Sequence, residues 1–226
     1  MNHISKTIYF YCIAYALLLT FVVVLLDTTP KLELHLMLNS YHTKLQDSFF
    51  KYYSMIAEGP IYVLVLLPLL WKKYKFTIFF GLCEISGGSI LQVLKHLFSS
   101  ERPSSAFEHY SHAVLPIVNG IDLHHSNSFP SGHASTFFMF FTCCAIYLAL
   151  RRNRTDKPNK ITLCVLFLML LVLAALGGFS RIYLSQHFLS DVCVGSIIGF
   201  ITPFILFHFA GSKIFNLKEE SLKKNE

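Results

Sequence analysis

Six long apolar runs, separated by short islands of charge, constrain this chain more than any other feature. Only 14% of its 226 residues are charged, against about a quarter in a typical soluble domain. About 20 apolar residues in a helix cross a hydrocarbon core of about 30 Å. The sequence therefore predicts an all-α, six-transmembrane helical bundle that forms a single domain over residues 1–226. We expect spans at residues 8–26, 55–71, 76–94, 134–150, 161–179 and 192–209.

The first run, Ile8 to Leu26, could also be the apolar region of a cleavable signal peptide. Such a region is usually about 7–15 residues long and ends in small residues. This run is longer and ends in Leu25, Leu26 and Asp27, so we interpret it as a retained anchor.

Pro30 to Ser54 mixes charged residues with leucines and phenylalanines. This pattern predicts an amphipathic segment lying along the membrane interface. The alternating leucines from Leu32 to Leu38 leave a short strand open at its start.

Basic residues fall on one side of the predicted bundle. Lys6, the island Lys72–Lys75, the loop Arg151–Lys160 and the lysines of the tail share that side. The positive-inside rule makes it cytoplasmic and places both termini there. The long polar connection from Lys95 to Ser131 and the short one from Ser180 to Asp191 then share the outer side.

The spacing of cations and cysteines argues against a nucleic-acid-binding protein and against a protein held by disulfides or zinc. The net charge of +6 could suggest nucleic-acid binding, but the cations form no stripe interleaved with aromatic residues. The six cysteines lie in apolar runs without metal-ligand spacing, so we expect buried thiols rather than disulfides or a zinc site.

The first of three polar motifs on the outer side is Lys95 with Arg102-Pro103, at the end of the third run. Such a pair can hold a phosphate through a Lys point charge and an Arg fork. The alternative is that both cations are ordinary residues of the membrane interface.

The second motif is Pro-Ser-Gly-His at residues 130–133, where the fourth run begins. Proline suits the first position of a helix, and Ser128 or Asn127 can cap it. Free N–H groups at this end of a helix dipole form an anion site, and an ordinary capped helix start is the alternative. The groups that we expect to be free belong to Ser131, Gly132 and His133.

The third motif holds Arg181, His187 and Asp191 in the last short connection. If the chain is helical from His187 onward, the histidine and Asp191 lie on one face. The carboxylate can take the proton of one ring nitrogen and leave the other nucleophilic. A purely structural hydrogen bond is the alternative.

Together the motifs supply what phosphoryl transfer needs: charge for the equatorial oxygens, an in-line nucleophile and a proton for the leaving oxygen. A two-metal phosphatase would need a cluster of carboxylates. The carboxylates near this side lack ligand-like spacing, so we expect chemistry without a metal or cofactor. They are Glu101, Glu108, Asp122 and Asp191.

The order and spacing of the motifs resemble the signature of the type-2 phosphatidic acid phosphatase superfamily. Lys95-(six)-Arg102-Pro103, Pro130–His133 and Ser180-Arg181-(five)-His187-(three)-Asp191 match without departure. The resemblance implies that His187 attacks phosphorus, that Asp191 orients its ring, and that His133 protonates the leaving alkoxide and then activates water. It also implies a set of phosphate-binding residues: Lys95, Arg102, Ser131, Gly132 and Arg181.

The resemblance further implies a phosphorylated membrane lipid as substrate. The short chain and the Ser-Phe-Pro-Ser-Gly-His and Tyr-Leu-Ser-Gln-His-Phe contexts resemble the bacterial branch of the family. This resemblance implies an enzyme of the bacterial cytoplasmic (inner) membrane with its site facing the periplasm. A lipid A phosphatase is our best interpretation. An undecaprenyl pyrophosphate phosphatase comes next, then a phosphatidylglycerol phosphate or phosphatidic acid phosphatase.

Two other functions need separate arguments. Related haloperoxidases resemble soluble helical proteins, so the apolar spans argue against that chemistry. A non-catalytic lipid-binding or transport protein stays open, but it would not need His187 and Asp191 in nucleophile geometry.

Some polar residues carry no assigned role. Glu84, inside the third run, must face the protein interior, and either a structural or a functional role is open. Four histidines in the long connection could bind a metal or a second phosphate, or could simply be exposed: His109, His112, His124 and His125.

Overall fold

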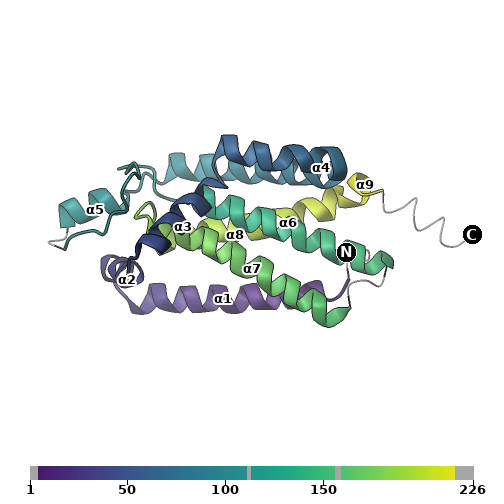
Figure 1. Ribbon diagram of the computed structural model, residues 1–226, viewed down its shortest axis with the longest axis horizontal. Coiled ribbons are helices and arrows are strands. Elements are labelled where there is room, and N and C mark those ends of the chain that lie inside the picture. Colours follow the sequence, from purple (N-terminus) through teal and green to yellow (C-terminus); the bar gives the residue numbers. More distant parts are fainter. Residues whose placement is uncertain (1–4, 111–112, 156–158, 217–226) are drawn as a thin grey trace, which may run out of the picture.

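The computed structural model describes residues 5–110, 113–155 and 159–216, with the backbone alone at residues 59–70, 72, 110 and 153–155. This part of the chain is helical and contains no strand, so the predicted all-α class is confirmed (Figure 1). The elements are α1 (Ile8–Thr28), α2 (Lys31–Leu38), α3 (Lys44–Met55), α4 (Gly59–Leu97), α5 (Pro103–Tyr110), α6 (Gly132–Thr155), α7 (Lys160–Tyr183), α8 (Leu189–Leu206), a π-helical turn (Phe207–Gly211) and α9 (Ser212–Ile214).

Five helical segments of the described chain are long and apolar enough to cross a membrane. They match the first, third, fourth, fifth and sixth predicted runs. The second run lies mostly in the first part of α4, where only the backbone is described, so the count of six spans stays a prediction. The five segments are Ile8–Thr28, Lys73–Leu97, Gly132–Arg152, Lys160–Tyr183 and Leu189–Ile214.

Helix α4 reverses direction at Lys73, whose backbone is not helical (φ −139°, ψ 43°). In Figure 1 the dark blue first part of α4 runs to the right, and the teal second part runs back. The basic island Lys72–Lys75 therefore lies at a sharp turn between two helical arms.

The predicted interfacial segment forms two short helices, α2 and α3, so the strand alternative is wrong. Thr43 caps α3, because its Oγ1 accepts a hydrogen bond from Gln46 N at 3.2 Å. Helix α3 lies against α7, where Tyr53 donates to the carbonyl of Leu173 at 2.9 Å. In α2 the ring of His35 lies 5.3 Å from that of Phe188. Helix α3 thus packs against α7, and α2 packs against the residue that precedes α8.

Glycines hold α8 close to α6. A Cβ added to Gly195 would lie 2.3 Å from the carbonyl oxygen of Ser131, and one added to Gly199 would lie 2.2 Å from that of Ser135. Only hydrogen fits at these positions, and such small surfaces let membrane helices approach closely. This close approach therefore fixes the start of α8 against the start of α6.

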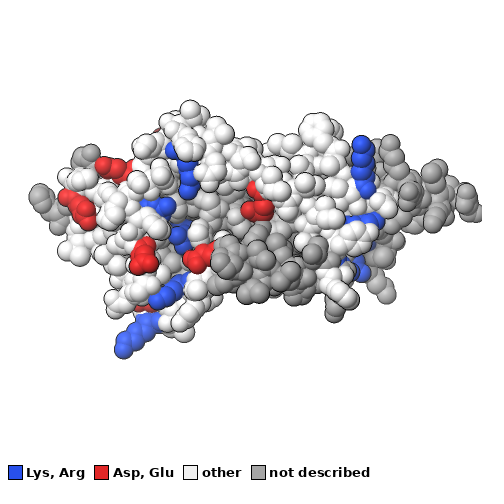
Figure 2. Space-filling view, turned by 90° about the horizontal axis from the view of Figure 1, so that it is seen from above, with Lys and Arg blue, Asp and Glu red and all other residues white. Residues whose placement is uncertain are grey.

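The basic connections lie at one end of the bundle and the three motifs at the other. Ser5 N donates to the carbonyl of Ala149 at 3.4 Å, and α9 also ends on this side, at the right of Figure 1. Among the described residues, the charged side chains that Figure 2 shows at this right-hand end are Lys and Arg, while acidic and basic side chains mix over the left half. Which side of the membrane each end faces stays a prediction.

Polar groups inside the bundle are mostly satisfied. All six cysteines are free thiols as predicted, but Cys12, Cys144 and Cys164 are only partly buried. The sulfurs of Cys83 and Cys143 lie 3.8 Å apart in the core. Glu84 accepts a hydrogen bond from Thr136 Oγ1 at 3.2 Å. This bond joins α4 to α6 and agrees with the structural role that was open for Glu84.

Candidate active site

The three motifs meet at the end of the bundle that lies on the left of Figure 1, opposite the basic connections. Ser131 N donates to the carbonyl of Asp191 at 3.0 Å, which joins the second motif to the third. Arg102 donates from NH1 to the carbonyl of Gln186 at 2.9 Å, which joins the first to the third. The predicted convergence of the motifs is therefore present in the fold.

A tight turn between α7 and α8 places His187. The backbone N–H groups of Gln186 and His187 donate to the carbonyl of Arg181 at 2.9 and 3.1 Å. Ser185 takes a positive φ of 54°, which reverses the chain. His187 thus precedes α8, and the helix that was considered from His187 onward begins at Leu189.

Asp191 nevertheless faces His187, because its carboxylate folds back over the helix start. Oδ2 of Asp191 accepts from the N–H of Phe188 at 2.9 Å, as an acidic residue in the first turn often does. The same oxygen lies 3.7 Å from Nδ1 of His187, which is ion-pair distance and longer than a hydrogen bond.

Ser128 fixes the protonation of the His187 ring. Its hydroxyl donates to Oδ2 of Asp191 at 2.6 Å, and its oxygen lies 3.4 Å from Nδ1 of His187. A hydroxyl has one proton. Since that proton goes to Asp191, the Ser128 oxygen can only accept from Nδ1–H. The arrangement assigns the ring proton to Nδ1 and leaves Nε2 as a free nucleophile.

His187 is only 2% exposed. Burial lowers the pKa of His187 to about 4, and the nearby charges of Arg102 and Arg181 act in the same direction against the opposing Asp191. Because the ring is then neutral at physiological pH, its free nitrogen is available for attack.

Two buried arginines surround the histidine. Arg102 donates from Nε to the carbonyl of Ser126 at 2.9 Å and from NH1 to Gln186. Burial lowers the pKa of Arg102. Arg181 donates from NH1 to Ser54 at 3.1 Å, and its buried Nε has no hydrogen-bond partner within the described part of the chain.

Lys95 is the third cation of the predicted set. It lies in the last turn of α4, half-buried, and interacts electrostatically with Arg102 and Asp191. The structure therefore brings Lys95, Arg102 and Arg181 around one carboxylate and one imidazole.

The start of α6 differs from the prediction. The helix begins at Gly132, so Pro130 precedes it, and Ser131 Oγ takes the capping position by accepting from Ala134 N at 3.4 Å. The prediction of a free N–H at Ser131 is wrong, because this group donates to the carbonyl of Asp191. Ser131 is also completely buried. It fastens α6 to α8 and does not face the solvent.

Gly132 and His133 keep the predicted anion-binding geometry. As the first residues of a helix, their N–H groups have no intrahelical acceptor. A Cβ added to Gly132 would meet nothing within 4 Å. Open space therefore adjoins the positive end of the α6 dipole, where an anion is stabilised.

His133 faces the same space, and its ring makes a long contact with the carboxylate of Glu58. Its Nε2 lies 4.0 Å from Oε1 of Glu58 and the side chain is 25% exposed. Nε2 makes no hydrogen bond to any described residue. The charges of Arg181, Lys95 and Arg102 act on this ring, so His133 shares the cationic site and can exchange a proton with a group bound there.

Four contributors to the site escaped the sequence reasoning. Ser128 was considered only as a helix cap. Gln186 lies inside the third motif and could have been noticed as a polar neighbour of His187. Ser54 and Glu58 gave no signal, since Ser54 lies 127 residues from its partner Arg181.

The described histidines of the long connection do not gather into a metal site. His109 faces Glu101 at 3.4 Å, and His125 faces Ser105 at 3.3 Å, while His112 lies outside the described residues. No three His, Cys, Asp or Glu side chains of the described chain are placed to hold a metal ion.

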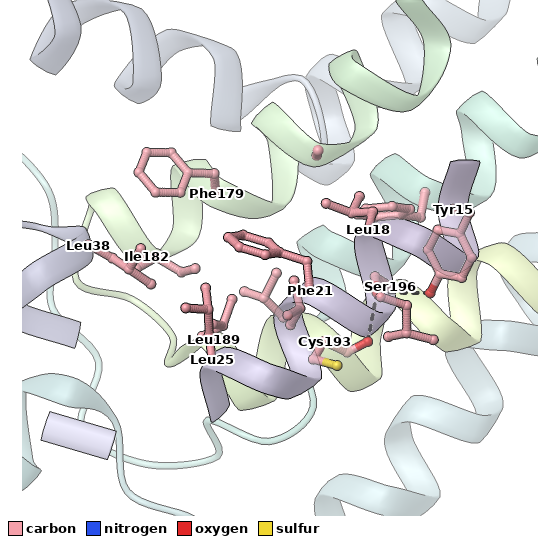
Figure 3. A pocket seen from close by; sticks show the side chains of 15 residues that line it. Tyr15, Leu18, Phe21, Leu25, Leu38, Phe179, Ile182, Leu189, Cys193 and Ser196 are labelled. Atoms are coloured by element: carbon pink, nitrogen blue, oxygen red, sulfur yellow. Dashed lines mark hydrogen bonds between the residues drawn. The ribbon is translucent and has the colours of Figure 1, made fainter. Parts of the chain in front are cut away.

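Two cavities lie near this end of the bundle. A polar one of about 270 Å³ lies beside Arg181 and Gln186. An apolar groove of about 190 Å³ lies between α1, α7 and α8. Figure 3 shows Phe21, Ile182 and Leu189 converging on the groove, whose few polar atoms bond one another: Tyr15 with Ser196 at 3.1 Å, and Ser196 with the carbonyl of Cys193 at 2.7 Å.

Sequence comparison finds relatives over most of the chain. A sequence model described as the PAP2 superfamily matches residues 76–215. Undecaprenyl-diphosphatase BcrC of Bacillus subtilis is 26% identical over 179 residues, which cover 76% of this chain and 78% of BcrC. Probable lipid phosphate phosphatase 4 of Arabidopsis thaliana is 39% identical over 84 residues, 36% of this chain and 27% of the plant protein. The chain spans less than two thirds of the first curated relatives that it matches, 27% and 58% of their lengths.

The fold is also that of a solved structure. LpxE of Aquifex aeolicus superposes with a TM-score of 0.63, covering 81% of this chain and 98% of LpxE at 24% sequence identity. At this identity the likeness concerns the fold alone.

Proposed function

Because this chain belongs to the PAP2 superfamily, we propose that it is an integral membrane lipid phosphatase that works through a phosphohistidine at His187. One observation carries the proposal. A buried imidazole, with its proton held on Nδ1 by Ser128 and Asp191, stands among the cations Lys95, Arg102 and Arg181.

The first step is attack of His187 Nε2 on phosphorus. A P–N bond forms, the P–O bond to the lipid breaks, and the leaving oxygen takes its proton from His133. The three cations and the N–H groups of Gly132 and His133 stabilise the charge on the equatorial oxygens, which is the main requirement of phosphoryl transfer.

The second step releases phosphate. Water attacks the phosphohistidine and gives a proton to His133, now acting as a base. The P–N bond breaks and His187 is restored in its neutral form. Asp191 keeps the ring oriented in both steps, which is the usual task of a carboxylate behind a catalytic histidine.

The donor set supports chemistry without a metal or cofactor. A two-metal phosphatase needs several carboxylates around its ions, whereas the centre of this site holds cations, histidines and Asp191. Charge stabilisation that a metal would supply comes here from arginine and lysine.

A lipid substrate suits the surroundings of the site. The apolar groove is lined by Ile182 and Val192, the chain neighbours of Arg181 and Asp191. Since a helix rises 1.5 Å per residue, apolar surface for an acyl chain lies at the depth of the reacting phosphate. We place the site at the outer leaflet of a bacterial inner membrane, opposite the basic connections.

Within this class we favour a lipid A phosphatase. The second candidate is an undecaprenyl-diphosphatase, because BcrC matches along 76% of the chain.

The test is release of inorganic phosphate from lipids in detergent micelles by the purified protein. We expect activity to persist with a chelator and to fall at least about 10³-fold in His187→Ala. Loss of activity with chelator would contradict the metal-free mechanism. Full activity of His187→Ala would contradict the phosphohistidine, and a folded protein that releases no phosphate would favour a non-catalytic lipid-binding role.

Mass spectrometry of lipids from cells with and without the protein tests the substrate. We expect lipid A to lose a phosphate when the protein is present. An unchanged lipid A phosphate count, with a changed ratio of undecaprenyl diphosphate to monophosphate, would favour the second candidate.

A further inference from the structure

The polar cavity of about 270 Å³ contains charged groups that the proposed chemistry does not use. It is bounded by α3, by residues 120–124 and by the turn after α7, and its lining includes Lys51, Glu58, Asp122 and His124. Its volume is just below the range of roughly 300–1,000 Å³ that is typical of small-molecule sites. It therefore has room for one small polar group rather than for a lipid chain.

The cavity shares two residues with the candidate active site. Arg181 and Gln186 line it, and Gln186 also accepts from Arg102. The Gln186 side chain donates from Nε2 to the carbonyl of Asp122 at 2.9 Å. One glutamine thus connects the phosphate-binding arginine to the wall of the cavity.

The cavity lies on the side of the leaving group. Glu58 lines it and faces Nε2 of His133 at 4.0 Å. In the proposed reaction His133 protonates the oxygen that leaves phosphorus. The part of the substrate that carries this oxygen therefore lies nearest to the cavity.

The lining suits hydroxyl groups better than a second phosphate or an alkyl chain. Glu58 and Asp122 are acceptors that would repel an anion, whereas Lys51, Arg181 and the amide of Gln186 are donors. A hydroxyl both donates and accepts, so a polyol can satisfy both kinds of group. An alkyl chain would exclude water from these polar groups and offer them no hydrogen bond in return, which is costly.

We propose that this cavity binds a hydroxyl-bearing ring or polyol that carries the scissile phosphate, so that the substrate is a phosphorylated glycolipid or polyol lipid rather than a polyprenyl diphosphate. The inference rests on the proposed function and adds Lys51, Glu58, Asp122 and His124 as residues that determine specificity. The hydroxyls could come from a saccharide or from glycerol, which share this chemistry.

The experiment compares four substrates: lipid A with its saccharide, phosphatidylglycerol phosphate with its free glycerol hydroxyl, phosphatidic acid whose leaving diacylglycerol has none, and undecaprenyl diphosphate. The variant is Asp122→Ala, which keeps the carbonyl that holds Gln186. Glu108→Ala is the matched control, since it removes an exposed carboxylate outside the cavity.

We expect Asp122→Ala to raise the KM for a hydroxyl-bearing substrate about five- to tenfold more than the KM for phosphatidic acid, as for the loss of a hydrogen bond. Glu108→Ala should change neither. A larger effect with lipid A than with phosphatidylglycerol phosphate would identify a saccharide, and the reverse would identify glycerol.

Equal changes of KM for all substrates, or a selective change for undecaprenyl diphosphate, would overturn this inference and leave the phosphatase function standing. Failure of the wild-type protein to release phosphate from any of the four would overturn both.

Discussion

Ser128 donates a 2.6 Å hydrogen bond to Oδ2 of Asp191, across 63 residues of chain. The contact joins the connection before α6 to the first turn of α8. Because Ser128 has no second proton to give, the same bond determines which nitrogen of His187 is free. A completely buried serine thereby orients the proposed nucleophile.

Ser128→Ala should lower kcat about tenfold and change KM little, because it loosens the ring without removing a phosphate contact. Steady-state kinetics on a soluble aryl phosphate measures both constants. Ser126→Ala is the matched control, since the bond to Arg102 uses the Ser126 carbonyl and not its hydroxyl. A Ser128→Ala variant with raised KM and unchanged kcat would contradict the positioning role.

The pH dependence should reflect the buried His187. Since its folded pKa is about 4 and the unfolded value is about 6.5, the ring stays neutral down to about pH 4. We expect the acid limb of kcat/KM near pH 4, after correction for titration of the substrate. The unfolded state takes up this proton first, so stability from the neutral ring is full above about pH 6.5 and falls as the pH drops toward 4. An acid limb at pH 6.5 would show that the nucleophile is exposed.

Gly132→Ala tests the anion site at the start of α6. An added methyl meets nothing within 4 Å in the structure, so the melting temperature should stay within about 2 °C. The methyl would occupy the space that we assign to phosphate. Inhibition by inorganic phosphate should therefore weaken at least about tenfold, which corresponds to about 1.4 kcal/mol. Unchanged inhibition in a stable variant would place the phosphate elsewhere.

Gly195→Ala should destabilise the protein by about 1–3 kcal/mol, because the new methyl would meet the backbone of Ser131. Thermal unfolding in detergent measures the effect. Gly88→Ala is the control, since a methyl there meets no other atom and alanine is the better helix former. Equal melting temperatures would show that α6 and α8 can separate without cost.

Asn119→Cys tests the orientation, because Asn119 is exposed in the connection between α5 and α6. A membrane-impermeant thiol reagent should label it in intact cells, and Lys160→Cys, exposed at the other end, only after permeabilisation. The parent protein, with its own six thiols, gives the background. The reverse pattern would overturn the outward-facing site.

Long-range convergence of the motifs followed from the sequence because apolar runs set the order of spans and charge set their direction. Lys95, Arg102, His133 and Arg181 needed only to stand at the ends of those runs. The local geometry of the candidate active site did not follow from the sequence. His187 precedes α8, and Ser131 donates its N–H to the carbonyl of Asp191. Both features depend on contacts between segments, which the periodicity of apolar residues does not predict.

The short helices also could not be predicted from the sequence. Helix α2 was open to a strand interpretation because its leucines alternate, and tertiary packing of Leu34 and His35 against the site decided for a helix. The position of Glu58 near His133 was not predictable either, since the two residues are 75 positions apart in the sequence.

The connection between Thr155 and Lys160 joins α6 to α7 at the end of the bundle far from the reacting groups. Helix α7 has 24 residues and is about 36 Å long, so Lys160 lies about that far from the proposed reaction centre. The chain before Thr155 contains His133 and the chain after Lys160 contains His187. Under the proposed function, dividing the gene between Thr155 and Lys160 would give a split reporter that releases phosphate only when the two fragments assemble in the bilayer.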